Sequence, residues 1–477
     1  MQDQSVINSQ FNELSKYRSF LSDCINQAID EGQSLIASIA LPFNYLAPLA
    51  ILQSLDLDNQ LHFYSERSAD DTSLLAFGSV RLATFSGKKR FDLARDFSDT
   101  LKSQIKVYNS SRGHKLERPH FFSTFTFEDE LDDLDEFAPA TIFLPQWHVF
   151  SDSGQYGIVL NLEVVPSATI ATIIATLEQA FEYFLNMDYG QGKTQEARTL
   201  LEEKSFSLEE RLSVSSFEEA VKTALFEIEN DHYRKIVLAE KRIFENKSGL
   251  SGIDILDRLK EQFSACHLFS FSDGSDKVFV GASPEILLDV KSSILTTQAI
   301  AGSSSRGKKA VEDAKLGSSL LTSDRNLREH NLVKESLLRR LGRLGIKAQA
   351  DAQPRLLVLS NVQHLQTKIK AHIDCSAHFL EMASELFPTP AVGGQPREKA
   401  VPRINALEGF NRGLYSGLLG WFSDLGEGKM VVGIRSAQFS KDLIQIYAGA
   451  GIVAGSKPLV EQNEILLKQE ALLGILR

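Results

Sequence analysis

The stretch KVFVGASPEILLDVKSSILTTQAIAG, residues 277–302, decides the fold class. Its two apolar runs, 277–290 and 293–302, are bounded by turn residues and predict successive β-strands. Further runs of this kind occupy residues 235–244, 267–273, 355–373 and 429–453. Strands that follow one another in runs, without a helix after each strand, favour an α+β fold over a doubly wound sheet.

The N-terminal part continues this pattern. Residues 60–165 alternate short apolar runs with turn residues, which is typical of antiparallel sheet. Residues 168–227 have a helical pattern, and the charged stretch 202–210 is the best place for a boundary. We therefore expect a strand-rich subdomain over residues 1–210 and a catalytic region over residues 211–477, intertwined in one fold.

Two helices stand out in the C-terminal part. One is predicted over residues 322–344, where Ser323 or Asp324 can cap its start and Gly345 ends it. The other begins near Pro458 and closes the chain.

Composition excludes several classes of protein. The chain has 477 residues, 51 Lys plus Arg and 62 Asp plus Glu, which gives a formal net charge of −11. This acidic balance argues against a general nucleic-acid binder, although it leaves anionic small molecules possible. Three cysteines without a CxxC pair predict neither a disulfide framework nor a zinc knuckle, and they indicate a reducing compartment.

No targeting or membrane segment is expected. The first ten residues lack the basic and apolar regions of a signal peptide. The uncharged run 34–55 is long enough to span a bilayer, but Pro42, Asn44 and Pro48 interrupt it. We expect a cytoplasmic protein with no membrane or nucleic-acid partner.

Acidic residues on the two C-terminal helices are candidate metal ligands. Glu329 lies beside the apolar stripe of the first helix, and Glu461, Glu464 and Lys468 follow at i, i+3 and i+7 in the second. Carboxylates from two helices suit Mg²⁺, which keeps several waters and binds substrate anions. By spacing alone, ordinary surface charges are the better explanation of these residues.

Lys235 and Glu285 are candidates for acid–base chemistry. Lys235 opens an apolar strand, and Glu285 directly follows the sequence Gly-Ala-Ser-Pro. A lysine and a carboxylic acid at one pocket can act as base and acid. The spacing also leaves open that both are surface charges at strand ends.

The glycines of GAGIVA, residues 449–454, match a dinucleotide fingerprint. The acidic residue that this fingerprint requires on a second strand cannot follow, because one helix completes the chain. Gly449 and Gly451 therefore predict a place where the backbone approaches another group closely.

Nine motifs in order carry a family resemblance: KIVLAEK, FVGASPEILL, TTQAIAGSSSRG, EHNLV, NVQHLQTKI, FPTPAVGGQP, EGFNRGLYSGLLGW, VGIRSAQ and IYAGAGIVAGSKPLVEQNEILLK. They resemble the chorismate-utilising enzymes, which include isochorismate, salicylate, anthranilate and aminodeoxychorismate synthases. The match is dense over residues 230–477. It implies an anthranilate-synthase-component-I-like fold, in which large antiparallel β-sheets pack as a sandwich with helices outside.

The resemblance also implies roles for particular residues. Glu329 and Glu464 match the Mg²⁺-binding glutamates, with Glu461 beside them, Lys235 matches the base that activates water, and Glu285 matches the general acid. The substrate-binding positions that it implies are Gly302, Ser303, His364, Ala391, Arg435, Tyr447, Gly449, Gly451 and Lys468.

Three features select a member of the family. Members that add water carry a lysine at the position of Lys235. Ala301 stands where aminodeoxychorismate synthases have a nucleophilic lysine, and PTPAVGG, residues 388–394, resembles isochorismate synthases. These features imply Mg²⁺-dependent conversion of chorismate to isochorismate, in a menaquinone or phylloquinone pathway. No amidotransferase subunit is expected, and the family expectation is a monomer or homodimer.

Alternatives remain at this stage: a salicylate synthase, an isochorismate synthase of a siderophore pathway, or a homologue without catalysis. Two positions depart from the family pattern. Phe387 replaces a frequent histidine, and Glu240 replaces a frequent arginine. Glu240 could form an ion pair near the Lys235 strand or face solvent.

Overall fold

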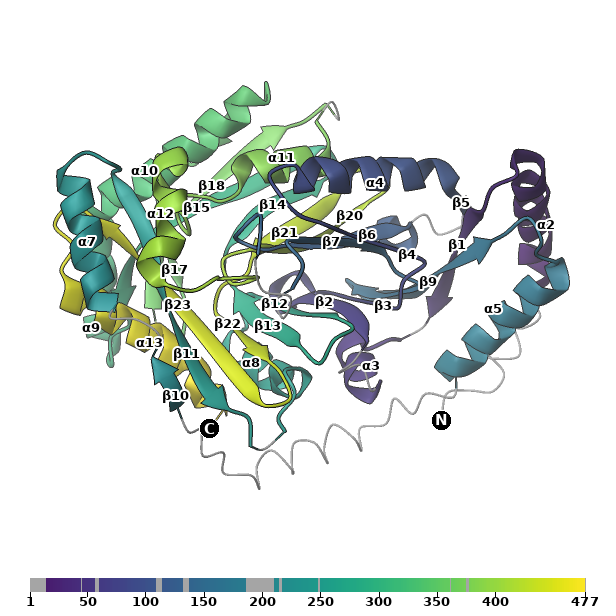
Figure 1. Ribbon diagram of the computed structural model, residues 1–477, viewed down its shortest axis with the longest axis horizontal. Coiled ribbons are helices and arrows are strands. Elements are labelled where there is room, and N and C mark those ends of the chain that lie inside the picture. Colours follow the sequence, from purple (N-terminus) through teal and green to yellow (C-terminus); the bar gives the residue numbers. More distant parts are fainter. Residues whose placement is uncertain are drawn as a thin grey trace.

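The computed structural model describes residues 14–43, 45–55, 60–108, 114–131, 137–185, 210–213, 217–247, 249–360, 362–374 and 377–476. Most of the predicted boundary stretch, 202–209, and Cys375 lie outside these residues. Figure 1 shows an elongated molecule in which two sheets run between helices.

The first sheet contains 13 strands among the described residues, in the order β10-β11-β23-β22-β13-β12-β2-β3-β8-β9-β1-β5, with β19 paired to β11. Its pairs are antiparallel except β1 with β5. The strands are β1 (Leu35–Phe43), β2 (Leu61–Arg67), β3 (Thr72–Phe77), β5 (Ile105–Tyr108), β8 (Trp147–Asp152), β9 (Gln155–Val164), β10 (Glu210–Ser213), β11 (Lys235–Glu245), β12 (His267–Asp273), β13 (Val278–Ser283), β19 (Gly394–Gln395), β22 (Ser436–Phe439) and β23 (Leu443–Val453).

The second sheet contains 10 strands over the described part of the chain, in the order β16-β18-β15-β14-β21-β20-β6-β7-β4, with β17 paired to β18. The strands are β4 (Arg81–Phe85), β6 (His120–Phe125), β7 (Ala140–Leu144), β14 (Ile286–Lys291), β15 (Ile294–Ser305), β16 (Ala348–Ala350), β17 (Arg355–Val358), β18 (Val362–His372), β20 (Leu418–Ser423) and β21 (Gly428–Val432).

Alternating side chains explain how the two sheets pack. On β12, Phe269 and Phe271 point to one face and join a core cluster with Phe122 and Phe143 of the second sheet. Leu268, directly before Phe269, belongs to a different cluster on the opposite face. The period of two therefore places one hydrophobic layer between the sheets and leaves the outer faces for helices.

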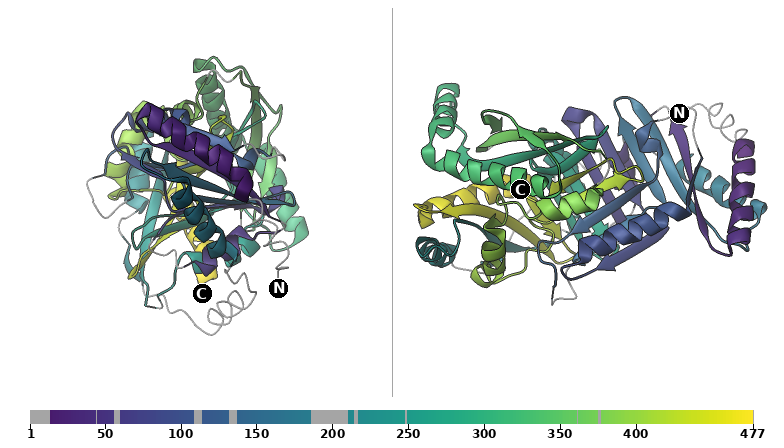
Figure 2. Two further views of the ribbon diagram at one scale, coloured as in Figure 1. Left: turned by 90° about the vertical axis from the view of Figure 1, so that its right-hand side faces the viewer. Right: turned by 90° about the horizontal axis from the view of Figure 1, so that it is seen from above.

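Helices cover both outer faces, as Figures 1 and 2 show. The first sheet is covered by α2 (Leu14–Glu31), α3 (Pro48–Ser54), α5 (Ile170–Leu185), α8 (Leu256–Gln262) and the C-terminal end of α13 (Pro458–Leu476). The second sheet is contacted by α4 (Arg90–Gln104), α10 (Asp324–Arg343) and α11 (Phe379–Leu386), while α7 (Phe217–Glu229) and α12 (Arg397–Glu408) contact β11 of the first sheet; residues of all five helices share one core cluster. A further helix, α9 (Ala310–Thr322), contacts β15 and β18. The predicted α+β sandwich with helices outside is confirmed.

The decisive stretch does more than form consecutive strands. Residues 277–290 divide into β13 in the first sheet and β14 in the second, with Pro284 and Glu285 at the crossing. Proline cannot donate a backbone hydrogen bond to a ladder, so the strand is interrupted there. As a result, Glu285 sits where the chain passes from one sheet to the other.

The remaining expectations about helices and domains compare with the structure as follows: one is confirmed and one needs a correction. Ser323 caps α10, because its hydroxyl accepts the backbone N–H of Asn326. The helical prediction over 168–227 is wrong at β10, which pairs with the edge of β11. Strands from both sides of residue 210 share each sheet, since β12 pairs with β2 and β20 pairs with β6. The boundary at 210 itself stays a prediction.

No helix in the described residues is long and apolar enough to cross a membrane.

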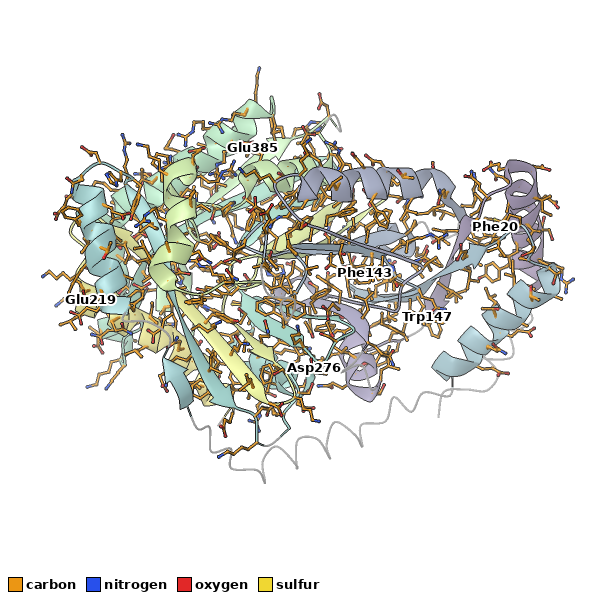
Figure 3. All side chains as sticks on the ribbon, viewed as in Figure 1. Phe20, Phe143, Trp147, Glu219, Asp276 and Glu385 are labelled. Carbon is orange, nitrogen blue, oxygen red and sulfur yellow. The ribbon has the colours of Figure 1, made fainter. Side chains whose placement is uncertain are left out.

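Figure 3 shows that side chains fill the space between the layers, with Phe143 and Trp147 in the region of the two sheets.

A buried ion pair joins several parts of this architecture. The guanidinium of Arg412 pairs with Glu408 at the end of α12, and both side chains are essentially inaccessible to solvent. Arg412 also donates to the backbone oxygens of Val237 on β11 and Val392 in the loop before β19, each at 2.8 Å. From the N-terminal half, the carboxylate of Glu128 accepts the backbone N–H of Arg412 at 2.8 Å.

Replacement of one partner of this pair should therefore be costly. We expect Arg412→Met to destabilise the protein by about 3–5 kcal/mol, because Glu408 is left buried without its countercharge. The matched control is Arg355→Met, whose ion pair with Asp351 lies at the surface, with side chains 66% and 37% exposed. That change should cost at most about 1 kcal/mol. Urea unfolding of both variants measures the difference, and equal midpoints would contradict the structural role of the buried pair.

Candidate active site

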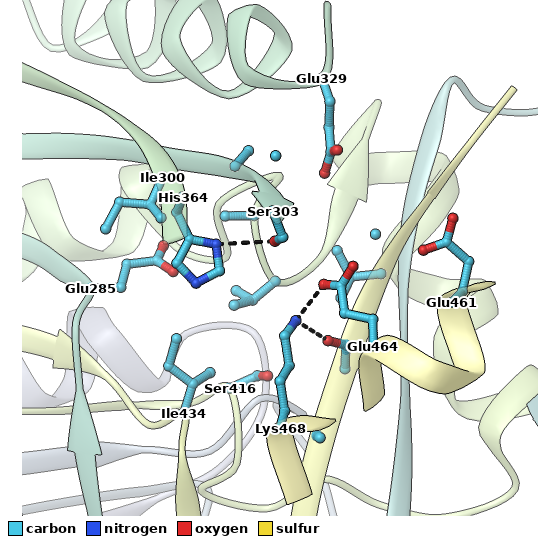
Figure 4. Close-up of a pocket in the computed structure, with 18 of the residues that line it drawn as sticks. Glu285, Ile300, Ser303, Glu329, His364, Ser416, Ile434, Glu461, Glu464 and Lys468 are labelled. Atoms are coloured by element: carbon cyan, nitrogen blue, oxygen red, sulfur yellow. Dashed lines mark hydrogen bonds and ion pairs between the residues drawn. The ribbon is translucent and has the colours of Figure 1, made fainter. Parts of the chain in front are cut away.

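A cavity between the two sheets and the N-terminal parts of α10 and α13 is lined by every residue that the sequence predicted for the site. Figure 4 shows part of this lining. The predicted residues that line it are Lys235, Glu285, Gly302, Ser303, Glu329, His364, Ala391, Arg435, Tyr447, Gly449, Gly451, Glu461, Glu464 and Lys468. These residues come from β11, β15, β18, β23, α10, α13 and connecting loops. The structure thus brings them together, while the role of each stays a prediction.

Lys235 and Glu329 form a close ion pair inside this cavity. Lys235 begins β11 with its side chain 1% exposed, and its Nζ lies 2.9 Å from Oε1 of Glu329 on α10. Gly451 on β23 permits this contact, because a Cβ at that position would lie 2.7 Å from the same Glu329 oxygen. The close approach predicted at this glycine is confirmed by that distance.

Two further carboxylates stand on α13, each with a cationic partner. Oε1 of Glu461 lies 2.6 Å from the guanidinium of Arg325 on α10, and Oε1 of Glu464 lies 2.7 Å from Nζ of Lys468. Burial raises the pKa of Glu461, and the negative charge of Glu464 acts in the same direction. Positive charge placed at these carboxylates therefore stabilises their ionised forms.

Glu285 combines deep burial with a raised pKa. Its side chain is almost fully buried at the crossing between the sheets, and burial raises its pKa to about 7. A hydrogen bond from Thr389 and the positive charge of Lys235 act in the opposite direction. The Thr389 hydroxyl lies 3.2 Å from Oε1 of Glu285. A carboxyl group with this pKa can hold a proton near neutral pH and release it to a substrate.

The directions of two hydrogen bonds set the protonation of His364. Its Nε2 lies 3.3 Å from the guanidinium nitrogen Nη2 of Arg435. Arginine can only donate a hydrogen bond, so Nε2 accepts. Burial and the charges of Arg435 and Lys468 hold the pKa of His364 well below its usual value. The neutral ring therefore carries its hydrogen on Nδ1, which lies 3.0 Å from the Ser303 hydroxyl. When Ser303 accepts this bond, its own hydrogen is available to the cavity.

Two tyrosines form a tightly packed part of the remaining wall. The rings of Tyr415 and Tyr447 stack with centroids 5.0 Å apart. Gly449 makes room for Tyr415, since a Cβ there would lie 2.9 Å from the tyrosine hydroxyl oxygen. Lys468 donates to the backbone oxygen of Gly449 at 2.7 Å, which fixes the end of this lysine in the cavity.

Sequence reasoning missed several residues of the cavity wall. Arg325, Asn326, Tyr415 and Ser416 line it together with the predicted set. Asn326 and Arg325 lie one turn before Glu329 in α10, so helical spacing from a candidate ligand was a usable signal. Tyr415 and Ser416 stand in a loop, where no periodicity points to them.

Glu240 and Phe387, the two departures from the family pattern, are both buried in the structure. Glu240 is 6% exposed and accepts a hydrogen bond from Gln462 at 2.8 Å, so the solvent-facing alternative is wrong. Phe387 is buried against Phe91 and Phe127 in the core. Neither side chain lines the cavity.

Several relatives resemble the chain. Isochorismate synthase MenF of Haemophilus influenzae is 35% identical over 255 residues, which are 54% of this chain and 59% of that protein. The salicylate biosynthesis isochorismate synthase of Pseudomonas aeruginosa is 34% identical over 54% of this chain and 53% of its own length. The match thus spans only about half to three fifths of these two proteins. Isochorismate synthase MenF of Bacillus subtilis is 26% identical over 79% of this chain and 78% of the relative.

Solved structures share the fold. MenF, the menaquinone-specific isochorismate synthase from Escherichia coli, superposes with a TM-score of 0.75 at 22% identity, covering 96% of this chain and all of that one. Anthranilate synthase component I from Streptococcus pneumoniae gives a TM-score of 0.67 at 20% identity, covering 85% of this chain and 92% of that one. The sequence model of the chorismate binding enzymes matches residues 21–477, nearly the whole chain. With that match, the protein belongs to the chorismate-binding enzyme family.

Proposed function

We propose that the protein is an isochorismate synthase, which adds water at C2 of chorismate and removes the C4 hydroxyl. The observation that carries the proposal is the meeting in one cavity of Lys235, from the first sheet, and Glu285, from the crossing between the sheets, with both side chains nearly inaccessible to solvent. A base and an acid in one small cavity suit addition at one ring carbon and elimination at another. The similarity to proteins named isochorismate synthase supports the same reaction.

In the proposed reaction, Arg435 binds a substrate carboxylate through its planar guanidinium. Lys235 acts as the base: it must first lose the proton that it carries in its ion pair with Glu329, and it then takes a proton from the water whose oxygen bonds to C2. Glu285, in its protonated form, gives its proton to the C4 hydroxyl, which leaves as water while the ring double bonds shift. One water enters and one leaves, so the product is an isomer of the substrate and no oxidant is needed.

Mg²⁺ is part of the proposal, with Glu329, Glu461 and Glu464 as the residues that would hold it. No group of three or more His, Cys, Asp or Glu close enough to hold a metal unaided occurs in the described residues. Mg²⁺ is commonly bound through one or two carboxylates together with waters and substrate oxygens, so the donors fit. When bound, the ion supplies positive charge for a substrate carboxylate. The mutual repulsion of Glu461 and Glu464 is consistent with such an ion.

The pathway is proposed to be that of menaquinone or phylloquinone, with the reaction in the cytoplasm. The likeness to menaquinone-specific MenF over 96% of the chain supports this choice. The products formed from chorismate separate the salicylate synthase and non-catalytic alternatives, and deletion of the gene followed by quinone analysis separates the siderophore alternative.

Product analysis tests the reaction directly. With chorismate and Mg²⁺ we expect isochorismate to accumulate without stoichiometric pyruvate and salicylate, which would instead identify a salicylate synthase. Lys235→Ala should lower turnover by about 10²–10⁴-fold, because the base is removed. The matched control is Lys247→Ala, a lysine just after the same strand whose side chain is 52% exposed. Turnover by Lys235→Ala at the level of this control would remove Lys235 as the base.

The pKa of Glu285 predicts a pH dependence. A general acid must be protonated, and Glu285 loses its proton as the pH rises through about 7. We therefore expect kcat/KM to fall about tenfold per pH unit above that value. Glu285→Gln should be nearly inactive and should lack this limb. A kcat/KM that keeps rising from pH 6 to pH 9 would contradict the assignment.

The carboxylates of α13 predict a metal dependence. Glu464→Gln should need a higher Mg²⁺ concentration for half-maximal turnover, since one ionised ligand is lost. The control is Glu470→Gln on the same helix, whose side chain is 51% exposed. Removal of Mg²⁺ by a chelator should abolish turnover in all variants. Identical Mg²⁺ titrations for Glu464→Gln and the control would exclude Glu464 as a ligand.

A further inference from the structure

The loop between α11 and β19 is held rigidly at both ends, although only Ala391 and Val392 of it line the cavity. Before Thr389, the guanidinium of Arg340 donates to the backbone oxygens of Leu386 and Pro388, each at 2.9 Å. After Thr389, Arg412 donates to the oxygen of Val392 at 2.8 Å. Two largely buried guanidinium groups thus determine where the Thr389 side chain lies.

The backbone of Thr389 is equally constrained. Its carbonyl oxygen accepts the N–H groups of Val392 at 3.2 Å and Gly393 at 2.9 Å, which closes a tight turn. Beyond this turn, Val237 on β11 donates to the oxygen of Gly393 at 2.8 Å. The loop therefore joins the strand of Lys235 to the surroundings of Glu285.

The Thr389 hydroxyl has a defined hydrogen-bond direction. Its oxygen accepts the backbone N–H of Ala391 at 3.2 Å, and a hydroxyl has only one hydrogen to donate. The hydroxyl donates this hydrogen to Oε1 of Glu285, and the two oxygen atoms lie 3.2 Å apart. If Oε1 carried the carboxyl proton instead, the hydroxyl would accept twice, and its own hydrogen would be buried without an acceptor, because Thr389 is only 2% exposed.

We infer that Thr389 is a positioning residue that keeps Oε1 of Glu285 as an acceptor and so places the carboxyl proton on Oε2, the oxygen that remains for the cavity. Among the described residues no hydrogen bond engages Oε2. The inference rests on the proposed role of Glu285 as the acid. It adds that the direction of proton delivery is set by a residue outside the cavity wall.

Other groups around Glu285 act differently. Lys235 on β11 contributes its positive charge, which lowers the pKa of Glu285 but binds neither oxygen. On β15, the Gln298 amide donates to the backbone oxygen of Pro284 at 2.9 Å, which fixes the turn and leaves the carboxyl group alone. Among the described side chains, Thr389 thus distinguishes the two carboxyl oxygens of Glu285, because it binds Oε1 and not Oε2.

Thr389→Val tests the inference, because it removes the hydroxyl and keeps the shape. We expect kcat to fall about 5- to 20-fold, with KM for chorismate changed by less than about twofold, since the proton is no longer held on the delivering oxygen. The alkaline limb of the pH profile should move to higher pH, because the hydroxyl bond stabilises the ionised carboxylate. Thr389→Ser should recover most of the wild-type rate. Thr100→Val, at an exposed position of α4, is the control.

A second measurement does not depend on turnover. The infrared difference between wild type and Glu285→Gln isolates the protonated carboxyl band of Glu285. In Thr389→Val, or in Thr389→Ala if the first variant does not fold, this band should shift to higher frequency and persist to higher pH.

The outcomes are distinguishable. Wild-type kinetics and an unchanged band in Thr389→Val, or a Thr389→Ser variant as impaired as Thr389→Val, overturn the positioning role while the acid assignment stands. Full activity of Glu285→Gln overturns the proposed acid itself.

Discussion

The buried ion pair between Arg412 and Glu408 is the interaction on which the site depends. A fully buried charge is tolerated only when it is paired and hydrogen-bonded, and Arg412 meets this condition with backbone oxygens of β11 and of the loop before β19. Glu408 in turn accepts the backbone N–H of Ala239 on β11 at 2.7 Å. The strand that begins at Lys235 and the loop that carries Thr389 are therefore held in one network.

Close backbone packing is the second constraint. Gly451 lets the Lys235–Glu329 pair form, and Gly281 allows the backbone oxygen of Arg435 to approach, since a Cβ there would lie 2.8 Å from it. Arg435 itself has a φ of 53°, a left-handed conformation that is unusual for a residue other than glycine. Such conformations persist only where the surroundings enforce them, and here they aim a guanidinium into the cavity.

The charges of the cavity explain how an acidic protein can serve a dianionic substrate within the proposed function. Four cations, Lys235, Arg325, Arg435 and Lys468, line the cavity together with four carboxylates, Glu285, Glu329, Glu461 and Glu464. A dianion binds favourably only when part of this negative charge is neutralised, by a proton on Glu285 and by a cation at the glutamates. The overall charge of −11 says little about this local balance.

The sequence by itself determined most strands, the main helices and many of the residues that line the cavity, because alternation, capping and ordered motifs are properties of short stretches. It did not predict Arg412, Thr389 or the burial of Glu240. Tertiary structure decided that 277–290 crosses between two sheets, and it paired Lys235 with Glu329, 94 residues away, and Thr389 with Glu285, 104 residues away. Burial and hydrogen-bond direction arise only when such distant segments pack together, and these two quantities set the protonation of the site.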